Sequence, residues 1–301
     1  MLKSYKNKSD INVLILGGTG MLGQALAKEA NSRGLSYKTV ARKNADINLD
    51  LTDKLSLINL IKNTQPQIVI NTIAKTNLDD CEKNPGTAYL LNSSIIGNLS
   101  LFCINSNIKI CHISTDHYFT SDKDKLHSET SQVKLLNEYA KTKFIGEILA
   151  LFNPKSLVVR TNIVGFRGWP ESPTFVEWVI NELLSNKEII MFEDYYTSSI
   201  DVKSFSKFLF DLIMKDICGL INLASRECIS KKDFILKIGN GLNLDLSNCR
   251  VGKLSSSNSL KRAESLGLDV SYAENLLGHK LPSANDVVNA LCSDYRNLNE
   301  I

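Results

Sequence analysis

The sequence predicts an α/β protein built on a doubly wound parallel sheet, with a smaller α/β lobe in its C-terminal part. Two observations support this prediction. Short apolar segments alternate with helical patterns of about 10–15 residues through the first half of the chain, which is typical of βαβ units. The first segment, residues 12–16, is short and closed by glycines, as in a strand buried on both faces.

The expected elements follow one another in a regular order up to Thr161, after which loop composition becomes frequent. Strands are predicted over residues 12–16, 37–41, 68–70, 108–113 and 157–159. Helices are predicted over residues 21–33, 52–64, 87–106, 138–151, 175–185 and 204–215. We therefore expect a first domain over residues 1–161 and a second, mainly over 162–301. The boundary is placed only to within about ten residues, because the chain can cross between the lobes more than once.

The composition excludes several functional classes. At roughly 150 residues per domain, a chain of 301 residues suggests two structural units or one large domain. Hydrophobic residues make up 43% and charged residues 22%, as in ordinary globular proteins. The 35 Lys and Arg exceed the 32 Asp and Glu by only three, and the charges are interspersed. We therefore expect no nucleic-acid polymer as a partner, since such a protein normally carries a strongly basic stripe.

The sequence also predicts a cytoplasmic protein without a membrane segment. No apolar run approaches the about 20 residues that span a bilayer, and the basic segment 1–10 has no apolar stretch behind it. The seven cysteines include no CxxC pair and no histidine in zinc-site spacing. Their apolar surroundings, such as those of Cys103, predict buried free thiols and no metal site.

A glycine-rich loop follows the first predicted strand and opens the first predicted helix. Gly17, Gly20 and Gly23 are spaced as G-x-x-G-x-x-G, which suits a tight turn, a close approach to a pyrophosphate and close packing of helix on strand. The helix N-terminus would supply free N–H groups for the phosphates. Strand, loop and helix are in register, so the sequence predicts a Rossmann-type dinucleotide site. Its expected residues are Gly17, Thr19, Gly20, Met21, Leu22 and Gly23.

The end of the second predicted strand indicates which dinucleotide binds. Arg42 and Lys43 follow this strand, and no acidic residue occurs before Asp46. An acidic residue there would bind the ribose 2′-hydroxyl of NAD, whereas an arginine accommodates the 2′-phosphate of NADP. The two cations favour NADP(H) over NAD(H), although a solvated loop would also carry them.

Tyr139 and Lys143 lie four residues apart near the start of a predicted helix and therefore share one helical face. A nearby ammonium lowers the pKa of a phenol from its usual value of about 10, which makes the phenol a better proton donor at neutral pH. An ordinary surface helix could carry the same pair. Its position decides the interpretation, because the preceding strand should end at the crevice where open α/β sheets bind ligands.

That preceding strand ends in a run of polar residues. Thr115 supplies a hydroxyl that could stabilise negative charge on a substrate carbonyl oxygen. Asp116 could orient the substrate or influence the proton of Tyr139, and a turn or helix cap is an equal alternative. His112 and His117 lack metal spacing, and His112 is expected within the strand.

These segments together resemble the extended short-chain dehydrogenase/reductase superfamily and, within it, the dTDP-4-dehydrorhamnose reductases and related nucleotide-sugar reductases. The matching stretches are the glycine loop, residues 50–53, 69–74 and 80–82, Asn92, residues 114–116, Tyr139 with Lys143, and residues 160–161 and 281–283. The resemblance extends along almost the whole chain. It implies an enzyme that acts on a nucleotide sugar. The formation of a homodimer stays open.

The resemblance also implies roles for individual residues. Thr115, Tyr139 and Lys143 would be catalytic with Asp116 in support, and Lys143 would also bond the nicotinamide ribose. The further cofactor contacts would be Arg42, Asp50 and Leu51 near the adenosine, Ala74 and Thr76 near the nicotinamide, and Asn92. Substrate contacts would be Thr115, Asp116, His117 and Arg262. Two departures are His117, where the family usually has an aromatic residue, and Ala263, where proline usually follows the arginine.

The resulting hypothesis is the NAD(P)H-dependent reduction of a nucleotide-activated 4-keto-6-deoxy sugar, for a cell-surface polysaccharide precursor. Related dehydratases usually place a glutamate where this chain has His117, which disfavours dehydration. An epimerase with tightly bound NAD would use the same Tyr–Lys pair and stays open. The chain also resembles the regulatory subunit of methionine adenosyltransferase, so a non-catalytic binding role on the same fold is the second alternative.

Overall fold

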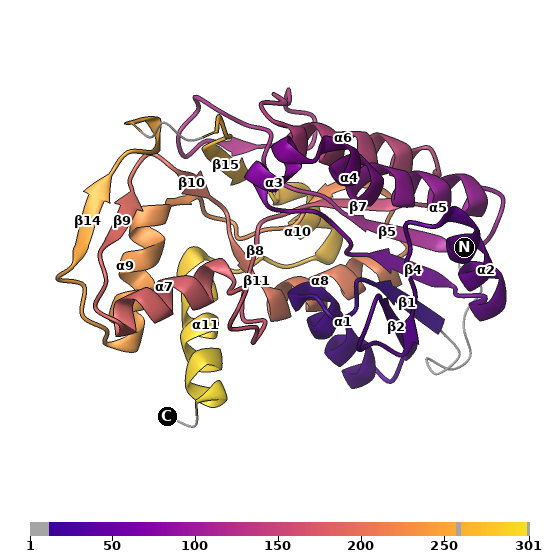
Figure 1. Ribbon diagram of the computed structural model, residues 1–301, viewed down its shortest axis with the longest axis horizontal. Helices are drawn as coiled ribbons and strands as arrows, with labels where there is room; N and C mark the ends of the chain where they lie inside the picture. Colours follow the sequence, from indigo (N-terminus) through magenta and orange to yellow (C-terminus); the bar gives the residue numbers. More distant parts are fainter. Residues whose placement is uncertain (1–11, 257–259, 300–301) are drawn as a thin grey trace. The chain divides into compact units, whose positions relative to one another are not determined.

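The computed structural model describes residues 12–256 and 260–299 (Figure 1). They form two compact units, and the chain passes between these units more than once. The first unit holds the described residues up to Thr115, Leu135–Arg160 and Ser206–Ile221; the second holds Asp116–Lys134, Thr161–Phe205 and the described residues from Asn222 onward. Segment 1–10, where we expect no secretory signal, lies outside the described residues. The division into a dinucleotide-binding domain over residues 1–161 and a mainly substrate-binding lobe over 162–301 stays a prediction.

The first unit is built on a seven-stranded sheet with the order β12-β7-β5-β4-β1-β2-β3. Its strands are β1 (Asn12–Leu16), β2 (Ser36–Ala41), β3 (Ile47–Asn48), β4 (Ile68–Asn71), β5 (Lys109–Ile113), β7 (Leu157–Arg160) and β12 (Gly219–Asn222). Parallel pairs run from β3 through β1 and β4 to β7. The chain moves outward from β1 in one direction and from β4 in the other, which confirms the predicted doubly wound α/β sheet.

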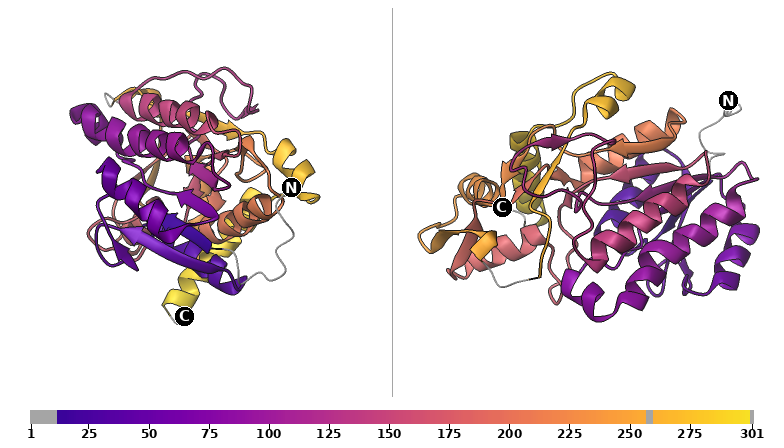
Figure 2. Two further views of the ribbon diagram at one scale, coloured as in Figure 1. Left: turned by 90° about the vertical axis from the view of Figure 1, so that its right-hand side faces the viewer. Right: turned by 90° about the horizontal axis from the view of Figure 1, so that it is seen from above.

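Helices cover both faces of this sheet (Figures 1 and 2). They are α1 (Met21–Ser32), α2 (Lys54–Thr64), α3 (Leu78–Lys83), α4 (Pro85–Tyr89), α5 (Ile95–Cys103), α6 (Glu138–Leu151) and α8 (Val202–Met214). On one face, α2, α5 and α6 share an apolar core with the strands, and Figure 2 shows α5 and α6 side by side. On the other face, Arg33 after α1 pairs with Asp211 of α8 at 2.8 Å.

The helix predicted over about residues 87–106 is present as a continuous helical stretch over 85–103, but it is not one regular α-helix. Pro85 occupies the first turn of α4, where its missing N–H is tolerated, so the helical region begins earlier. A π-helical turn at Leu90–Ser94 then separates α4 from α5. Such turns carry an extra residue and often occur at functional sites.

The second unit contains short strands and four helices among its described residues. The strands are β6 (Leu126–His127), β8 (Ile163–Val164), β9 (Ile189–Phe192), β10 (Tyr196–Thr197), β11 (Ile200–Asp201), β13 (Ile229–Ser230), β14 (Cys249–Gly252) and β15 (Ser265–Leu268). The helices are α7 (Phe175–Leu184), α9 (Lys231–Leu242), α10 (Ser271–Leu277) and α11 (Ala284–Leu298). Apolar residues of α7, β9, α9 and α11 form its core. The expected smaller α/β lobe is therefore present.

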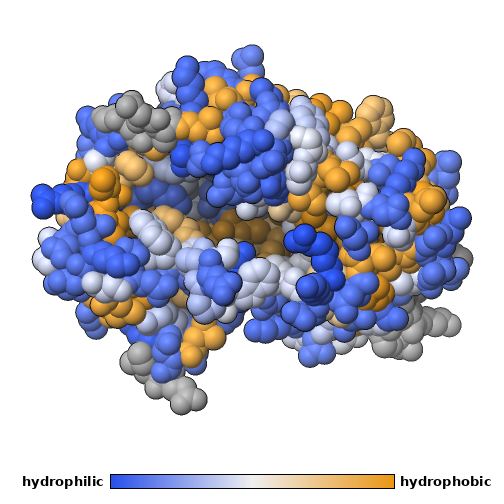
Figure 3. Space-filling model, in the orientation of Figure 1, coloured by the Kyte–Doolittle hydropathy of each residue, from blue (hydrophilic) through white to orange (hydrophobic). Residues whose placement is uncertain are grey.

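The face that Figure 3 shows is mainly hydrophilic, with hydrophobic residues among the polar ones. Within residues 12–256 and 260–299, no helix has the length and apolar character needed to cross a membrane. All seven cysteines are free thiols, and Cys103 is fully buried as its apolar neighbours predict.

Candidate active site

The glycine loop joins β1 to α1 in a conformation that larger residues would not fit. Gly17 has a φ of +85°, and a Cβ placed there would lie 2.5 Å from Oγ1 of Thr72. A Cβ on Gly23 would lie 2.3 Å from the carbonyl oxygen of Gly17, so α1 packs directly on the loop. The N-cap of α1, Gly20, has no side-chain cap, which leaves the first N–H groups of the helix available to an anion. These features fit a dinucleotide pyrophosphate.

The segment after β2 brings opposite charges together. Arg42 is exposed, and its charge adds to the hydrogen bonds from Thr52 that lower the pKa of Asp50. Asp46, which the sequence separates from the end of β2, folds back and accepts hydrogen bonds from the N–H and hydroxyl of Thr39 at 2.8 and 2.7 Å. These bonds lower the pKa of Asp46. The fold therefore places a carboxylate on β2 as well as two cations beyond it.

Asn92 lies in the π-helical turn and is fully buried. Its amide accepts from the N–H of Lys75 at 2.7 Å and donates to the carbonyl of Lys75 at 3.1 Å and to Oγ1 of Thr142 at 3.0 Å. Asn92 thus ties the segment after β4, which holds the predicted contacts Ala74 and Thr76, to α6. Ala74 is half-buried and Thr76 is exposed.

Helix α6 begins at Glu138, as predicted, because its N-cap Asn137 accepts a hydrogen bond from the N–H of Ala140. Tyr139 is 8% exposed and packs near Cys81 and Ala88, whereas Lys143 is 2% exposed. The ammonium of Lys143 donates to the carbonyl oxygen of Ile113 at 2.6 Å. Burial lowers the pKa of Lys143 to about 8, and the charge of Glu147 opposes that effect.

Glu147 is the centre of a buried polar network at the carboxyl ends of β5 and β7. It accepts from the hydroxyl of Ser114 at 2.6 Å and from Nη2 of Arg160 at 2.8 Å. Both members of the ion pair are at most 3% exposed. Ser114 directly precedes the predicted catalytic Thr115, which is also buried. The network therefore fixes the strand end that carries the hydroxyl.

The second unit begins at Asp116. Oδ2 of Asp116 accepts a hydrogen bond from the amide of Asn162 at 2.7 Å. His117 follows, with Nε2 4.0 Å from Asp116. Burial and the positive charges of Lys231 and Arg262 lower the pKa of His117 to about 4, so this imidazole is neutral at pH 7. Arg262 is half-buried, and its Nε is buried without a hydrogen-bond partner.

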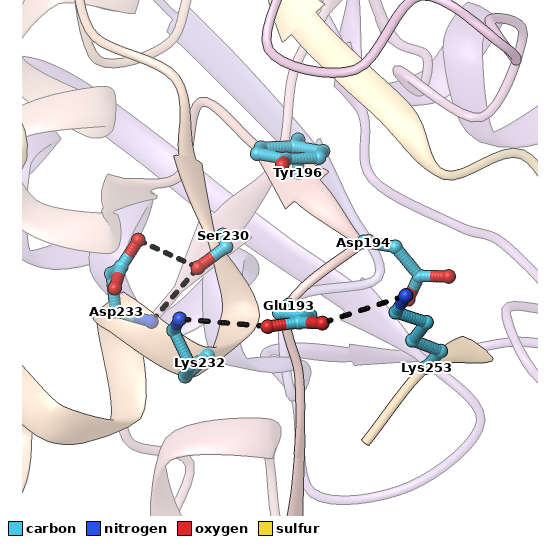
Figure 4. Close-up of a pocket in the computed structure, with 7 residues that line it drawn as sticks. All are labelled: Glu193, Asp194, Tyr196, Ser230, Lys232, Asp233 and Lys253. Atoms are coloured by element: carbon cyan, nitrogen blue, oxygen red, sulfur yellow. Dashed lines mark hydrogen bonds and ion pairs between the residues drawn. The ribbon is translucent and has the colours of Figure 1, made fainter. Parts of the chain in front are cut away.

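A polar cavity of about 310 Å³ lies on the second unit (Figure 4). Figure 4 shows Glu193 between the ammonium groups of Lys232 and Lys253, at 3.8 and 3.9 Å, and Ser230 bonded to Asp233. The charged side chains that line this cavity thus pair with one another. Among the residues that the structure describes, no group of three or more His, Cys, Asp or Glu side chains could hold a metal ion.

The comparison with protein families identifies the family. The model of the RmlD substrate binding domain matches residues 11–297. The chain belongs to this family. Its fold agrees with that of solved dTDP-4-dehydrorhamnose reductases.

Two curated relatives carry reductase names. This RmlD-family chain is 26% identical to the "Probable low-salt glycan biosynthesis reductase Agl14" of Haloferax volcanii, over 93% of this chain and 98% of that protein. It is 34% identical to a dTDP-4-dehydrorhamnose reductase of Aggregatibacter actinomycetemcomitans, over 50% of each chain. A third relative, methionine adenosyltransferase 2 subunit beta of Mus musculus, is 27% identical over 93% of this chain.

A solved structure confirms the fold. The dTDP-4-dehydrorhamnose reductase of Bacillus anthracis, solved in complex with NADP, superposes with a TM-score of 0.85 and 22% identity, over 94% of this chain and 99% of that one.

Sequence reasoning missed Glu147, Asn162 and Lys231. Glu147 carries a local signal, because it lies four residues after Lys143 on the same face of α6. Asn162 and Lys231 carry none, since each contributes through contacts with residues far away in the sequence.

Proposed function

We propose that this chain catalyses the NADPH-dependent reduction of the ketone of a nucleotide-activated 4-keto-6-deoxy sugar. The observation that carries the proposal is the buried Lys143 on α6, hydrogen-bonded to the end of β5 and one helical turn after Tyr139. Family membership and the reductase names of two relatives support it. The product would be a precursor of a cell-surface polysaccharide or glycan.

The proposed mechanism assigns a role to each side chain of the site. NADPH, when bound, would supply the hydride for the ketone carbon. Tyr139 donates the proton to the developing alkoxide, Lys143 stabilises the resulting phenolate and bonds the nicotinamide ribose, and Thr115 donates a hydrogen bond to the ketone oxygen. Asp116, His117 and Arg262 contact the substrate. Asn92, a predicted cofactor contact, holds the backbone of Lys75 and the hydroxyl of Thr142 through hydrogen bonds.

We propose NADP(H) as the preferred cofactor, since Arg42 and Lys43 are exposed beyond β2. The glycine loop would hold the pyrophosphate through Gly17, Thr19, Gly20, Met21, Leu22 and Gly23, and Asp50 and Leu51 would lie against the adenosine. The carboxylate of Asp46 opposes this preference, because an acidic residue near the end of this strand favours NAD(H). A comparison of NADPH binding with NADH binding therefore measures the balance between Arg42 and Asp46.

The experiment is a panel of nucleotide 4-keto-6-deoxy sugars mixed with the protein and NADPH, followed by NADPH absorbance. Consumption with one or more of them supports the proposal. Isomerisation by a protein that retains NAD, without net NADPH consumption, would favour an epimerase instead.

The similarity to methionine adenosyltransferase 2 subunit beta favours a second candidate function, a non-catalytic regulatory subunit. Affinity purification of the tagged chain from its own host tests it. Recovery of a stoichiometric catalytic subunit, together with no reduction of any sugar in the panel, would replace the reductase by this role.

We also propose a cytoplasmic homodimer. Seven free thiols suit a reducing compartment. Large apolar side chains are exposed at the neighbouring C-terminal ends of α5 and α6, namely Leu101, Phe102, Ile104, Ile148, Leu151 and Phe152. An apolar face of this kind suits burial against a second copy. Sedimentation of the native chain and of Phe152→Asp tests it, since only the variant should be monomeric.

A further inference from the structure

Lys231 is a buried cation that the proposed mechanism does not use. It is the first residue of α9 and is only 8% exposed. Its ammonium lies 4.1 Å from the ring centre of Phe175, 5.7 Å from that of Phe234 and 5.8 Å from that of Tyr195. Within the described part of the chain, this ammonium makes no hydrogen bond and no ion pair. Burial lowers its pKa to about 8, and the carboxylate of Asp116 opposes that effect.

The position of Lys231 is unfavourable for a purely structural lysine. A cation at a helix N-terminus is repelled by the helix dipole, and a buried ammonium is costly unless it is paired. Contact with the three rings returns only part of that cost. A methionine would fill the same space without a charge, so the packing alone does not explain the ammonium.

Arg262 is a second cation whose charge acts on a neighbour of Lys231. The charges of Lys231 and Arg262 both act on the imidazole of His117, so both cations lie near it in the second unit. The buried Nε of Arg262 also has no partner. Asp116 is the carboxylate that acts on Lys231, and it is already bonded to Asn162. Two cations, Lys231 and Arg262, therefore act on the neutral imidazole of His117, and the carboxylate of Asp116 acts on Lys231.

We propose that Lys231 is a specificity-determining residue whose ammonium, with the guanidinium of Arg262, binds an oxyanion of the substrate. The oxyanion is a diphosphate oxygen or a carboxylate on the sugar, and both offer the same charge-assisted contact. This inference rests on the proposed function in taking the ligand to be a nucleotide sugar. The rings of Phe175, Phe234 and Tyr195 exclude water from the ammonium, which strengthens its attraction for an anion. They also hold the side chain in place before binding, which lowers the entropic cost.

The test compares Lys231→Met with a matched control, Lys232→Met. Lys232 is the next residue on α9, but its ammonium faces Glu193 in the cavity of Figure 4. Binding to the full chain, without cofactor, is measured by calorimetry for uridine, UDP, UDP-glucose and UDP-glucuronate, and for thymidine and dTDP. A thermal melt of each variant checks folding, and Lys231→Gln replaces the methionine variant if that one does not fold.

We expect Lys231→Met to weaken binding of the recognised anion by about tenfold or more, and Lys232→Met to stay within about twofold of the native chain. Loss for every diphosphate, with nucleosides unchanged, identifies the diphosphate; loss for UDP-glucuronate alone identifies a sugar carboxylate. Native-like binding of all compounds by Lys231→Met, or no binding of any by the native chain, would overturn the inference. Lys231-dependent binding in a chain that reduces no sugar would refute the reductase function and leave the anion site standing.

Discussion

The ammonium of Lys143, on α6, donates a hydrogen bond to the carbonyl oxygen of Ile113, the last residue of β5, at 2.6 Å. This contact fixes the distance between the helix that carries Tyr139 and the strand end that precedes Thr115. It also keeps a charge in a buried place, where its pKa falls to about 8. The proposed acid, its cationic neighbour and the hydroxyl are therefore held by one local arrangement.

The pH dependence of turnover should follow Lys143. Its ammonium is charged below its pKa of about 8 and loses the proton above it, so kcat/KM should fall as the pH rises through that value. The measurement is a pH profile of NADPH consumption. Lys141→Met serves as the control, because Lys141 lies on the exposed side of α6 in an ion pair with Glu138. A profile without a fall in the alkaline range would contradict this role of Lys143.

Removing the phenolic hydroxyl should separate binding from chemistry. Tyr139→Phe keeps the buried ring but loses the proton donor, so we expect turnover to fall about 10²–10⁴-fold while NADPH binding stays near normal. Fluorescence titration of NADPH and initial rates measure the two effects. If the variant turns over like the native enzyme, Tyr139 is not the acid.

The ion pair of Glu147 with Arg160 should be important for stability. Glu147→Gln leaves the guanidinium buried without its carboxylate, and breaking a buried pair in this way costs about 3–5 kcal/mol. Urea denaturation measures the free energy of unfolding. The control, Glu138→Gln, breaks the surface pair with Lys141 and should cost less than about 1 kcal/mol. Equal losses in both variants would show that the network contributes no more than a surface contact.

The glycine loop should tolerate no side chain at Gly23. A Cβ there would meet the carbonyl oxygen of Gly17 at 2.3 Å, and backbone cannot move aside as a flexible side chain can. Gly23→Ala should therefore destabilise the protein by about 1–3 kcal/mol and weaken NADPH binding. Gly86→Ala is the control, because a Cβ at this position in α4 meets no atom within 4 Å. Native-like NADPH binding by Gly23→Ala would argue against the loop as the pyrophosphate site.

Arg42 should distinguish the two cofactors. We expect Arg42→Ala to weaken NADPH binding and leave NADH binding little changed, because only NADPH carries the 2′-phosphate. Dissociation constants for both cofactors, measured side by side, give the ratio. Equal losses for the two would refute contact with the 2′-phosphate.

Local sequence signals were sufficient to predict most helices and strands of the first unit. The strand Asn12–Leu16 has the predicted bounds because glycines follow it. The helix Glu138–Leu151 has the predicted bounds because Asn137 caps it. The helix predicted over about residues 87–106 is present, but the sequence pattern did not predict the π-helical turn at Leu90–Ser94 within it. The sequence pattern also did not show that Ser206–Ile221 belongs to the first unit. This assignment depends on contacts between residues that are far apart in the sequence.

The sequence alone determined three features of this protein. They are the α/β class, the glycine loop after an apolar strand, and the spacing of Tyr139 and Lys143 along one helix. These features depend on neighbours within a few residues, where helical and extended periodicity dictate which side chains share a face. The tertiary structure decided which residues that are apart in the sequence come into contact. These are Glu147 with Arg160, Asp46 with Thr39, and Lys231 with three aromatic rings near His117. Burial sets the charge state and partners of such groups, and burial is a property of the folded chain rather than of any segment.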